Sequence, residues 1–266
     1  MSSSRQVHKA DAFAALHDGE PFVIPNPWDA GSARVLAALG FRALATTSSG
    51  FAFTLGRLDG GVTLDEMVEH TAVLDRATEL PVSVDLENGY GGDPESCAHA
   101  IARVAEAGAV GGSIEDYDPA GFLYEPGHAA ERVAAAAETA HGLGFPFMLT
   151  ARAENHIRGN PDLEDTIARL QSFEAAGADV LYAPGLRRVD EIRAVCDSVS
   201  KPVNVLALPG LSLADLVGAG AQRVSVGGGL AWVAVKALAD AATAIRDDGD
   251  LSVLAAKVPL GEWFAG

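Results

Sequence analysis

Basic residues are few in this chain. Lysine and arginine total 19 against 36 aspartate and glutamate residues, which gives a formal net charge of −17. No stretch gathers the basic residues into a cluster. Nucleic acids and anionic membrane surfaces are bound through a basic footprint, so we expect neither as a partner. To bind an anionic substrate, such an acidic chain needs a local metal ion or arginine.

Cysteine and long apolar runs are also scarce. The two cysteines, Cys97 and Cys196, lie far apart in helix-like segments, so we expect no disulfide and a reducing, cytoplasmic setting. No run approaches the roughly 18 uninterrupted apolar residues of a membrane helix. The first ten residues, MSSSRQVHKA, hold no long apolar run, so nothing there resembles a signal peptide.

What the chain does contain is one alternation of strand-like and helix-like patterns, repeated eight times. Hydrophobic residues make up 48 % of its 266 residues, which is enough for a sizeable core. The predicted strands cover residues 22–25, 43–47, 82–86, 110–114, 147–151, 180–182, 203–206 and 223–226. The predicted helices cover 30–39, 64–78, 95–107, 129–141, 163–176, 189–198, 212–217 and 230–245, with an extra leading helix at 7–17.

Glycines end several of these helices, as in the Ala-Gly-Ala segments at Gly108, Gly177 and Gly220, because a helix C-cap favours glycine. Eight strand–helix units in one chain predict an α/β fold, a single-domain (β/α)₈ TIM-type barrel that includes residues 1–266. Its strands and helices should run from about residue 20 to 246, with Met1–Gly19 and Leu251–Gly266 outside. A doubly wound open sheet is the alternative, although it would not require eight units.

The segment Pro81–Gly92, PVSVDLENGYGG, looks like the chemical centre of the chain. Its apolar alternation predicts a buried strand that carries Asp85 near its carboxyl end and Glu87 just beyond. The next predicted strand ends in Glu115 and Asp116. Carboxylate oxygens from neighbouring strands suit a hard divalent cation such as Mg²⁺ or Mn²⁺. The simpler alternative is a turn that happens to be acidic.

Other strand ends add groups that can hold an anion. Thr47, Ser48 and Ser49 offer hydroxyls and backbone N–H groups, which can form an anion cradle. Arg152 can hold a substrate carboxylate with its guanidinium fork or simply neutralise the acids beside it. Gly227–Gly229 opens the last helix, as in phosphate-binding barrels, and leaves that type of barrel as a rival interpretation.

Five segments of the sequence resemble those of a known family. NPWDAGSARVLAALGF, TTSSG leading to LGRLD, VDLENGYGG, SIEDYD and TARAE occur in this order, and together they resemble the isocitrate lyase/phosphoenolpyruvate mutase superfamily. The resemblance covers the first two-thirds of the chain, and from Tyr182 onward it lies mainly in the rhythm of the elements. It implies a TIM-type barrel that binds Mg²⁺ and cleaves or rearranges bonds next to a 2-oxo or 2-hydroxy carboxylate. It also implies a homo-oligomer, a dimer or a tetramer that exchanges a C-terminal helix between subunits.

The resemblance also implies roles for individual residues. Asp85 would meet the metal directly, Glu87 would stand beside it, and Glu115 would hold it through water. Asp59, on the loop after the second strand, would be a catalytic acid. The substrate carboxylate would be bound by Thr47, Ser48, Ser49 and Arg152.

One loop departs from that family. Tyr117–His128 reads YDPAGFLYEPGH and lacks the cysteine of the lyase branch as well as the lysine and asparagine of the mutase branch. The chain therefore resembles a branch without the catalytic-loop cysteine. Tyr124 is the predicted proton donor, with water as the alternative, and His128 is expected to begin the next helix. Gly121 and Gly127 could serve as the pivots of a lid, or the loop could be fixed.

The predicted function is that of a lyase or decarboxylase that requires Mg²⁺ or Mn²⁺ and acts on a small 2-oxo or 2-hydroxy carboxylate through a pyruvate-like enolate. Arg152, Asp59 and Tyr124 are its predicted catalytic residues. Two alternatives stay open: a phosphonopyruvate-type hydrolase or phosphoenolpyruvate phosphonomutase, and a barrel that binds the metal and anion without catalysis. Trp263 and Phe264, near the end of the chain, are expected to pack on a neighbouring subunit, or else internally.

Overall fold

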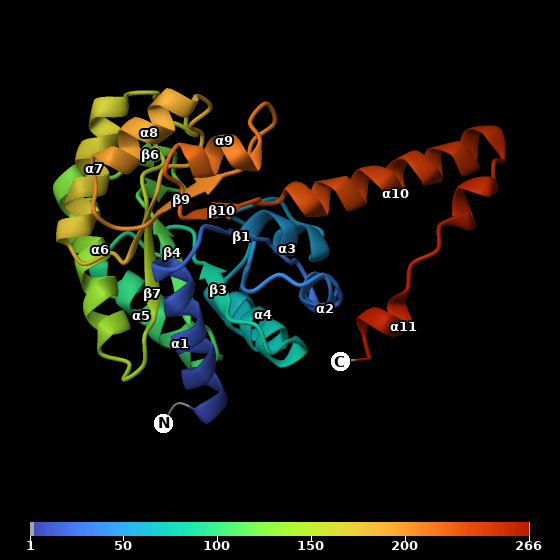
Figure 1. Cartoon of the computed structure of the whole chain (residues 1–266), viewed down its shortest axis with the longest axis horizontal. Coiled ribbons are helices and arrows are strands. Elements are labelled where there is room, and N and C mark those ends of the chain that lie inside the picture. Colours follow the sequence, from blue (N-terminus) through green and yellow to red (C-terminus); the bar gives the residue numbers. More distant parts are fainter. Residues whose placement is uncertain (1–2, 266) are drawn as a thin grey trace.

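The computed structural model describes residues 3–265, and their main feature is one parallel sheet of eight strands. Its order is β1-β10-β9-β8-β7-β4-β3-β2. The amide of Ala45 donates to the carbonyl of Pro25 at 3.1 Å, which ties β2 to the end of β1 and brings the two edges together. The result is a nearly closed barrel (Figure 1). The predicted (β/α)₈ barrel is confirmed.

The strands are short and sit close to the predicted positions. The barrel strands are β1 (Phe22–Ile24), β2 (Leu44–Ala45), β3 (Val82–Asp85), β4 (Gly111–Glu115), β7 (Met148–Arg152), β8 (Val180–Tyr182), β9 (Val203–Leu206) and β10 (Arg223–Ser225). A separate two-stranded hairpin consists of β5 (Tyr117–Asp118) and β6 (Phe122–Leu123).

The helices that follow these strands also match the predicted pattern. They are α2 (Ala30–Ala38), α4 (Leu64–Ala77), α5 (Pro94–Glu106), α6 (Pro126–His141), α7 (Leu163–Ala175), α8 (Val189–Asp197), α9 (Leu213–Gly218) and α10 (Gly229–Asp248). The remaining helical segments are α1 (Ser4–Asp18), α3 (Ser48–Thr54), η1 (Ser252–Ala255) and α11 (Leu260–Trp263). No helix among the described residues is long and apolar enough to cross a membrane.

Helix starts follow from local sequence chemistry. Asp29 and Ser32 form a capping box at the start of α2, and Thr63 and Glu66 form another at α4. Each pair satisfies backbone N–H groups that a helix start otherwise leaves unpaired. The same signal was missed at Thr47, whose side chain accepts a bond from the amide of Gly50 and begins α3. The serines that follow the predicted second strand therefore form the first turn of a helix.

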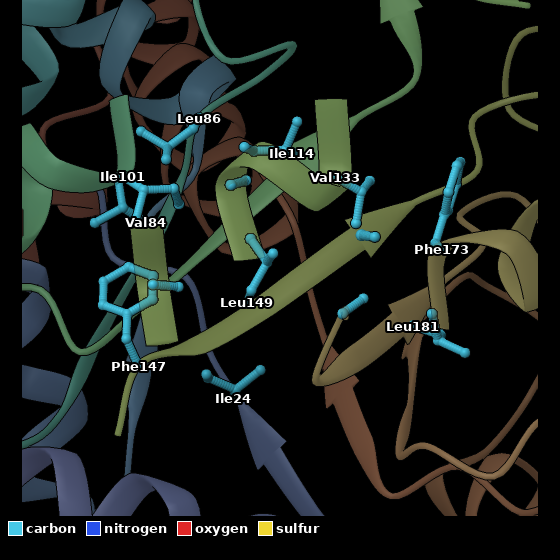
Figure 2. Packing of buried hydrophobic residues seen from close by; sticks show 14 of the residues in the cluster. Ile24, Val84, Leu86, Ile101, Ile114, Val133, Phe147, Leu149, Phe173 and Leu181 are labelled. Atoms are coloured by element: carbon cyan, nitrogen blue, oxygen red, sulfur yellow. The ribbon is translucent and has the colours of Figure 1, made fainter. Parts of the chain in front are cut away.

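The hydrophobic core lies between the barrel strands and the surrounding helices. Figure 2 shows Val84, Ile114 and Leu149 from three neighbouring strands, together with Ile101 of α5 and Phe173 of α7. All five are at most 2 % exposed. Because side chains alternate along a strand, the residues between these apolar positions face the interior of the barrel. There the chain places polar groups, whereas barrel interiors are more often filled by branched apolar residues.

Helix α1 closes the amino-terminal end of the barrel. Phe13 is fully buried and its ring would meet any side chain added at Gly111 of β4. His17 packs edge-on against both Phe13 and Phe22 of β1. The extra helix predicted at 7–17 is thus part of the barrel's structure, although it precedes the first strand.

Helix α10 departs from the usual arrangement, in which the eighth helix covers the sheet. Figure 1 shows it extending away from the barrel, and the chain then returning so that α11 lies beside α2. Only Ala231 of α10 is buried. At the tail, the guanidinium of Arg34 lies 5.6 Å from the ring centre of Phe264, so this part of the tail packs on its own chain. The Phe264 side chain is nevertheless 40 % exposed.

Candidate functional site

A cavity of about 210 Å³ opens at the carboxyl ends of the strands and extends into the barrel. It is lined mainly by polar and charged groups. Most of the predicted site residues line it: Thr47, Ser48, Ser49, Asp59, Asp85 and Arg152. Residues from both ends of the chain, such as Asn26 and Gly227, line the same cavity, so the fold brings the predicted strand ends together.

Arg152, the last residue of β7, is surrounded by carboxylates. Its Nη1 lies 2.9 Å from Asp85 Oδ1, and its Nη2 lies 3.0 Å from Glu115 Oε2 and 2.8 Å from Glu154 Oε1. The ring centre of Tyr182 lies 5.3 Å from the guanidinium carbon. The sequence allowed Arg152 either to hold a substrate carboxylate or to neutralise the acids beside it. The structure shows the contacts of the second role, with three carboxylates of the chain.

Glu115 sits deeper than the other predicted metal ligands. It is 8 % exposed, and its Oε1 lies 3.0 Å from Nη2 of Arg158 while its Oε2 faces Arg152. Burial raises the pKa of this carboxyl, which the two arginines counteract. Glu115 is therefore held by two cations of the chain itself.

Asp59 and Glu87 have no salt bridge within residues 3–265, whereas Asp85, which lies near them, is paired with Arg152. Glu87 Oε1 is buried without a hydrogen-bond partner among the described residues. Burial, together with the charges of Asp85 and Asp59, raises the pKa of Glu87 to about 7. Its backbone has φ of 49°, a left-handed conformation that non-glycine residues seldom adopt. A strained backbone thus holds the Glu87 carboxylate near Asp85 and Asp59, and one oxygen of that carboxylate lacks a hydrogen-bond partner among the described residues.

These three acids fit a divalent cation that keeps part of its water shell. Within residues 3–265, no three His, Cys, Asp or Glu side chains converge as a ready-made ligand set. Mg²⁺ is commonly held by one or two carboxylates and several waters, so a complete protein cage is not required. Glu87 Oε1, which has no hydrogen-bond partner among the described residues, and the carboxylate of Asp85, which Arg152 contacts from one side, provide such a partial set.

The hydroxyl run lies at the start of α3, next to Asp85. The amide of Ser48 donates to Asp85 Oδ2 at 3.4 Å, and the Oγ atoms of Thr47 and Ser49 lie 3.2 Å apart. These groups line the same cavity as Arg152. They occupy the place where the resemblance predicts a cradle for the substrate carboxylate.

Tyr124 does not line the cavity. Its hydroxyl donates to Asp118 at 2.7 Å and accepts from the side-chain amide of Asn88 at 3.0 Å, and its ring lies over the guanidinium of Arg132 at 4.0 Å. The residue is 5 % exposed. In this geometry Tyr124 anchors the β5–β6 hairpin, and the predicted proton-donor role finds no support. His128 lies in the first turn of α6, as expected.

The sequence analysis assigned no role to the polar lining deeper in the barrel. Tyr182, Asn204, Arg223 and Ser225 all line the cavity. The alternation in Arg223-Val224-Ser225 carried the signal, because a buried Val224 implies that its two neighbours face the other side of the sheet. At Gly228, an added side chain would collide with Ser49 Oγ at 2.8 Å and Trp232 Nε1 at 2.6 Å. Close packing therefore explains this glycine without a bound phosphate.

Comparison with known proteins shows the family of the chain. Residues 13–246 match the family model described as phosphoenolpyruvate phosphomutase. A solved structure from Burkholderia cenocepacia J2315, described provisionally as a lyase/mutase, is 51 % identical with a TM-score of 0.96 and covers 99 % of this chain and 98 % of that one.

Two curated relatives are similar to this chain over most of its length. An uncharacterized protein of Mycobacterium tuberculosis (strain ATCC 25618 / H37Rv) is 35 % identical over 237 residues, with 88 % of each chain covered. An oxaloacetate decarboxylase of Paraburkholderia xenovorans (strain LB400) is 32 % identical over 239 residues, which is 85 % of this chain and 78 % of the relative. The chain belongs to the phosphoenolpyruvate phosphomutase family, within the isocitrate lyase/phosphoenolpyruvate mutase superfamily of lyases and mutases.

Proposed function

We propose that this enzyme is a divalent-metal-dependent lyase that decarboxylates an oxaloacetate-like 2-oxo acid. The observation that carries the proposal is the group of Asp59, Asp85 and Glu87 beside the buried Arg152. Asp59 and Asp85 line the cavity, and Glu87 keeps a buried oxygen without a hydrogen-bond partner among the described residues. A lyase of this kind needs one cation for the developing charge and a second positive group for the carboxylate. The site offers a place for the first and supplies the second.

Asp85 and Glu87 would hold Mg²⁺ or Mn²⁺, with Glu115 and Asp59 close enough to fix its water ligands. When bound, such an ion stabilises negative charge that develops on the oxygens of a 2-oxo acid. Glu87 must be ionised to take part, and its pKa of about 7 makes metal binding dependent on pH.

The residues of the chain would orient the substrate. Arg152, whose N–H groups already contact Asp85, Glu115 and Glu154, would attract a carboxylate with its charge and with the one Nη1 N–H that remains. Thr47–Ser49, which line the same cavity, would donate to that carboxylate as well. Such fixed orientation aligns the breaking bond with the carbonyl group. The electron pair of the bond between C3 and the departing carboxylate moves into the 2-oxo group, carbon dioxide leaves, and an enolate of the remaining acid is formed.

A decarboxylase fits this chain better than a lyase that requires a loop acid. The Tyr117–His128 segment has no cysteine, and Tyr124 points away from the cavity. An enolate left by decarboxylation can take its proton from water, so no loop donor is required. The relative from Paraburkholderia xenovorans is named an oxaloacetate decarboxylase, which supports this choice. The phosphonate alternative would need further cationic groups beside the reacting atoms. Within the described residues no lysine lines the cavity, and its second arginine, Arg223, lies below the acid cluster.

The test is turnover of a panel of substrates with Mg²⁺. Oxaloacetate should release carbon dioxide and pyruvate, and a metal chelator should stop the reaction. 2-Methylisocitrate and phosphonopyruvate should react far more slowly. Release of phosphate from phosphonopyruvate at a comparable rate would replace the proposal with carbon–phosphorus chemistry, and no turnover on any of the three would favour a binding protein.

We further propose that the chain forms a homo-oligomer through α10 and the segment after it. Trp232, Val233 and Leu238 on α10 are 44 %, 67 % and 67 % exposed, and Leu251 and Leu254 are 65 % and 66 % exposed. So large an apolar surface is typical of an interface. Sedimentation should give a dimer or tetramer, and Leu238→Asp together with Val233→Asp should lower the mass. A monomeric native chain would contradict the proposal.

A further inference from the structure

A second arginine lies inside the barrel, below the acid cluster. Arg223 is the first residue of β10, its side chain is 5 % exposed, and it lines the same cavity as Arg152. Its Nη2 reaches Thr150 of β7, two residues before Arg152. One step of two residues along a strand is about 6–7 Å, so the two arginines belong to successive layers of the barrel.

The partners of Arg223 are all neutral. Its Nε donates to Asn204 Oδ1 at 2.8 Å, its Nη2 donates to Thr150 Oγ1 at 2.8 Å, and its Nη1 lies 3.2 Å from His17 Nε2. A guanidinium has five N–H donors, so two remain beyond these three contacts. No salt bridge joins Arg223 to a carboxylate anywhere in residues 3–265.

The titratable neighbours add no negative charge. His17 Nδ1 lies 2.9 Å from the carbonyl of Phe13, to which it donates, so Nε2 is left to accept from Arg223. Burial and the charge of Arg223 lower the pKa of His17 to about 3, and the ring is neutral at pH 7. Burial raises the pKa of Tyr182 to about 12, so its hydroxyl keeps its proton. The interior therefore holds one positive charge without a counter-charge.

A buried charge is costly unless it is paired, and here the unpaired charge borders a cavity. The volume of about 210 Å³ is far above the roughly 10–15 Å³ that a single water occupies by the same kind of measure. We propose that Arg223 binds a small monovalent anion, a carboxylate or a group of similar size, in the barrel interior beneath the acid cluster. The anion is either a second carboxylate of the substrate or a separate small ion.

Binding at Arg223 can be tested without turnover and without the metal. Crystals of the unmodified enzyme soaked in bromide should show an anomalous peak within hydrogen-bonding distance of the Arg223 guanidinium. Its absence, with the guanidinium bonded to water alone, would overturn the inference. A failure of the proposed decarboxylation would leave this result untouched, since neither substrate nor Mg²⁺ is present.

Asn204→Asp provides the sharpest variant, because it is nearly isosteric and places a carboxylate 2.8 Å from Arg223 Nε. The native enzyme should melt roughly 2–4 °C higher in bromide or formate at about five times the dissociation constant, at fixed ionic strength. This rise should disappear in Asn204→Asp and persist in the control Thr150→Val, which removes only a neutral partner. An anion response or an anomalous peak that persists in Asn204→Asp would contradict the inference.

Competition identifies the source of the anion. If the substrate provides the anion, malonate should displace bromide. Asn204→Asp should then lower the affinity for malonate at least tenfold and leave the affinity for acetate at the mouth unchanged. If the ion is separate, malonate and bromide should bind together without competition. Each of these results supports the site at Arg223. Equal bromide binding by the native enzyme and Asn204→Asp would exclude it.

Discussion

The mouth and the interior of the barrel place their arginines in opposite electrostatic settings. Arg152 contacts three carboxylates, from Asp85, Glu115 and Glu154. Arg223, one layer below, contacts only neutral groups. The mouth therefore carries excess negative charge around a cation, whereas the interior carries an unbalanced positive charge. Together the two layers suit a cation above and an anion below.

The difference also explains where each region's stability comes from. At the mouth, Arg152 compensates acids that burial would otherwise force to bind protons. In the interior, neutral oxygen and nitrogen atoms share the charge of Arg223 without cancelling it. Removing Arg152 should thus affect the three carboxylates that pair with it. A change around Arg223 should affect one charge, that of Arg223 itself.

The largest expected effect follows from the substitution Arg152→Met. It leaves the buried Glu154 and Glu115 with Arg158 as their remaining cation and takes the cation partner from Asp85. Removal of one partner from a buried pair typically costs about 3–5 kcal/mol. Denaturant unfolding should show this loss, and turnover of oxaloacetate should fall at least about 10²-fold. Arg152→Lys should recover part of the stability. If Arg152→Met unfolds like the native enzyme, the mouth does not depend on this charge balance.

The second prediction concerns Glu87 and pH. Its pKa is about 7 in the folded chain against an ordinary value of 4.5, so the folded state binds the proton more tightly than the unfolded state. Stability should therefore fall as pH rises from about 4.5 to about 7 and then level off, by up to about 3 kcal/mol from this group. The difference between pH 5 and pH 8 should shrink in Glu87→Gln. Mg²⁺ should stabilise the native enzyme more at pH 8 than at pH 5.5, and an unchanged pH profile in Glu87→Gln would contradict the assignment.

The third prediction gives the interior a counter-charge. Asn204→Asp adds a carboxylate beside Arg223 and should raise the free energy of unfolding by about 1–2 kcal/mol in an anion-free buffer, as expected for a charge-assisted hydrogen bond. The matched substitution Asn204→Ala should lower it. Destabilisation by Asn204→Asp would mean that Arg223 is already compensated.

The smallest effect is expected at Tyr124. Tyr124→Phe removes hydrogen bonds to Asp118 and Asn88 and should cost about 1 kcal/mol of stability. Because the hydroxyl points away from the cavity, kcat on oxaloacetate should stay within about threefold of the native value. A loss of roughly 10²-fold or more would restore the proton-donor role predicted from the sequence.

The barrel was predictable because its signals are local and repeated. Apolar alternation such as that in Val82–Asp85 marks strands, and glycines such as Gly108 mark helix ends. The position of Asp85 near a strand end then placed it at the mouth without further information. The barrel prediction is confirmed, and most of the proposed site residues share one cavity.

The contacts of individual side chains were not predictable in the same way. Tyr124 lies in a loop whose sequence also suits a lid, and only the folded chain shows its hydroxyl on Asp118. Arg223 escaped notice because three-residue strands give little periodicity, and its partners come from positions 17, 150 and 204. The outward course of α10 depends on how the chain leaves β10, which no local pattern specifies.

The central claim is that Asp85 holds a divalent metal that assists cleavage of a carbon–carbon bond. The most direct measurement is oxaloacetate decarboxylation, followed as pyruvate formed, by the native enzyme and Asp85→Asn in Mg²⁺ and in chelator. The surface substitution Asp190→Asn serves as a control. Chelation and Asp85→Asn should each reduce kcat/KM by roughly 10³-fold, while Asp190→Asn should have no effect. Native turnover that is unchanged in chelator, or Asp85→Asn with full activity, would contradict it.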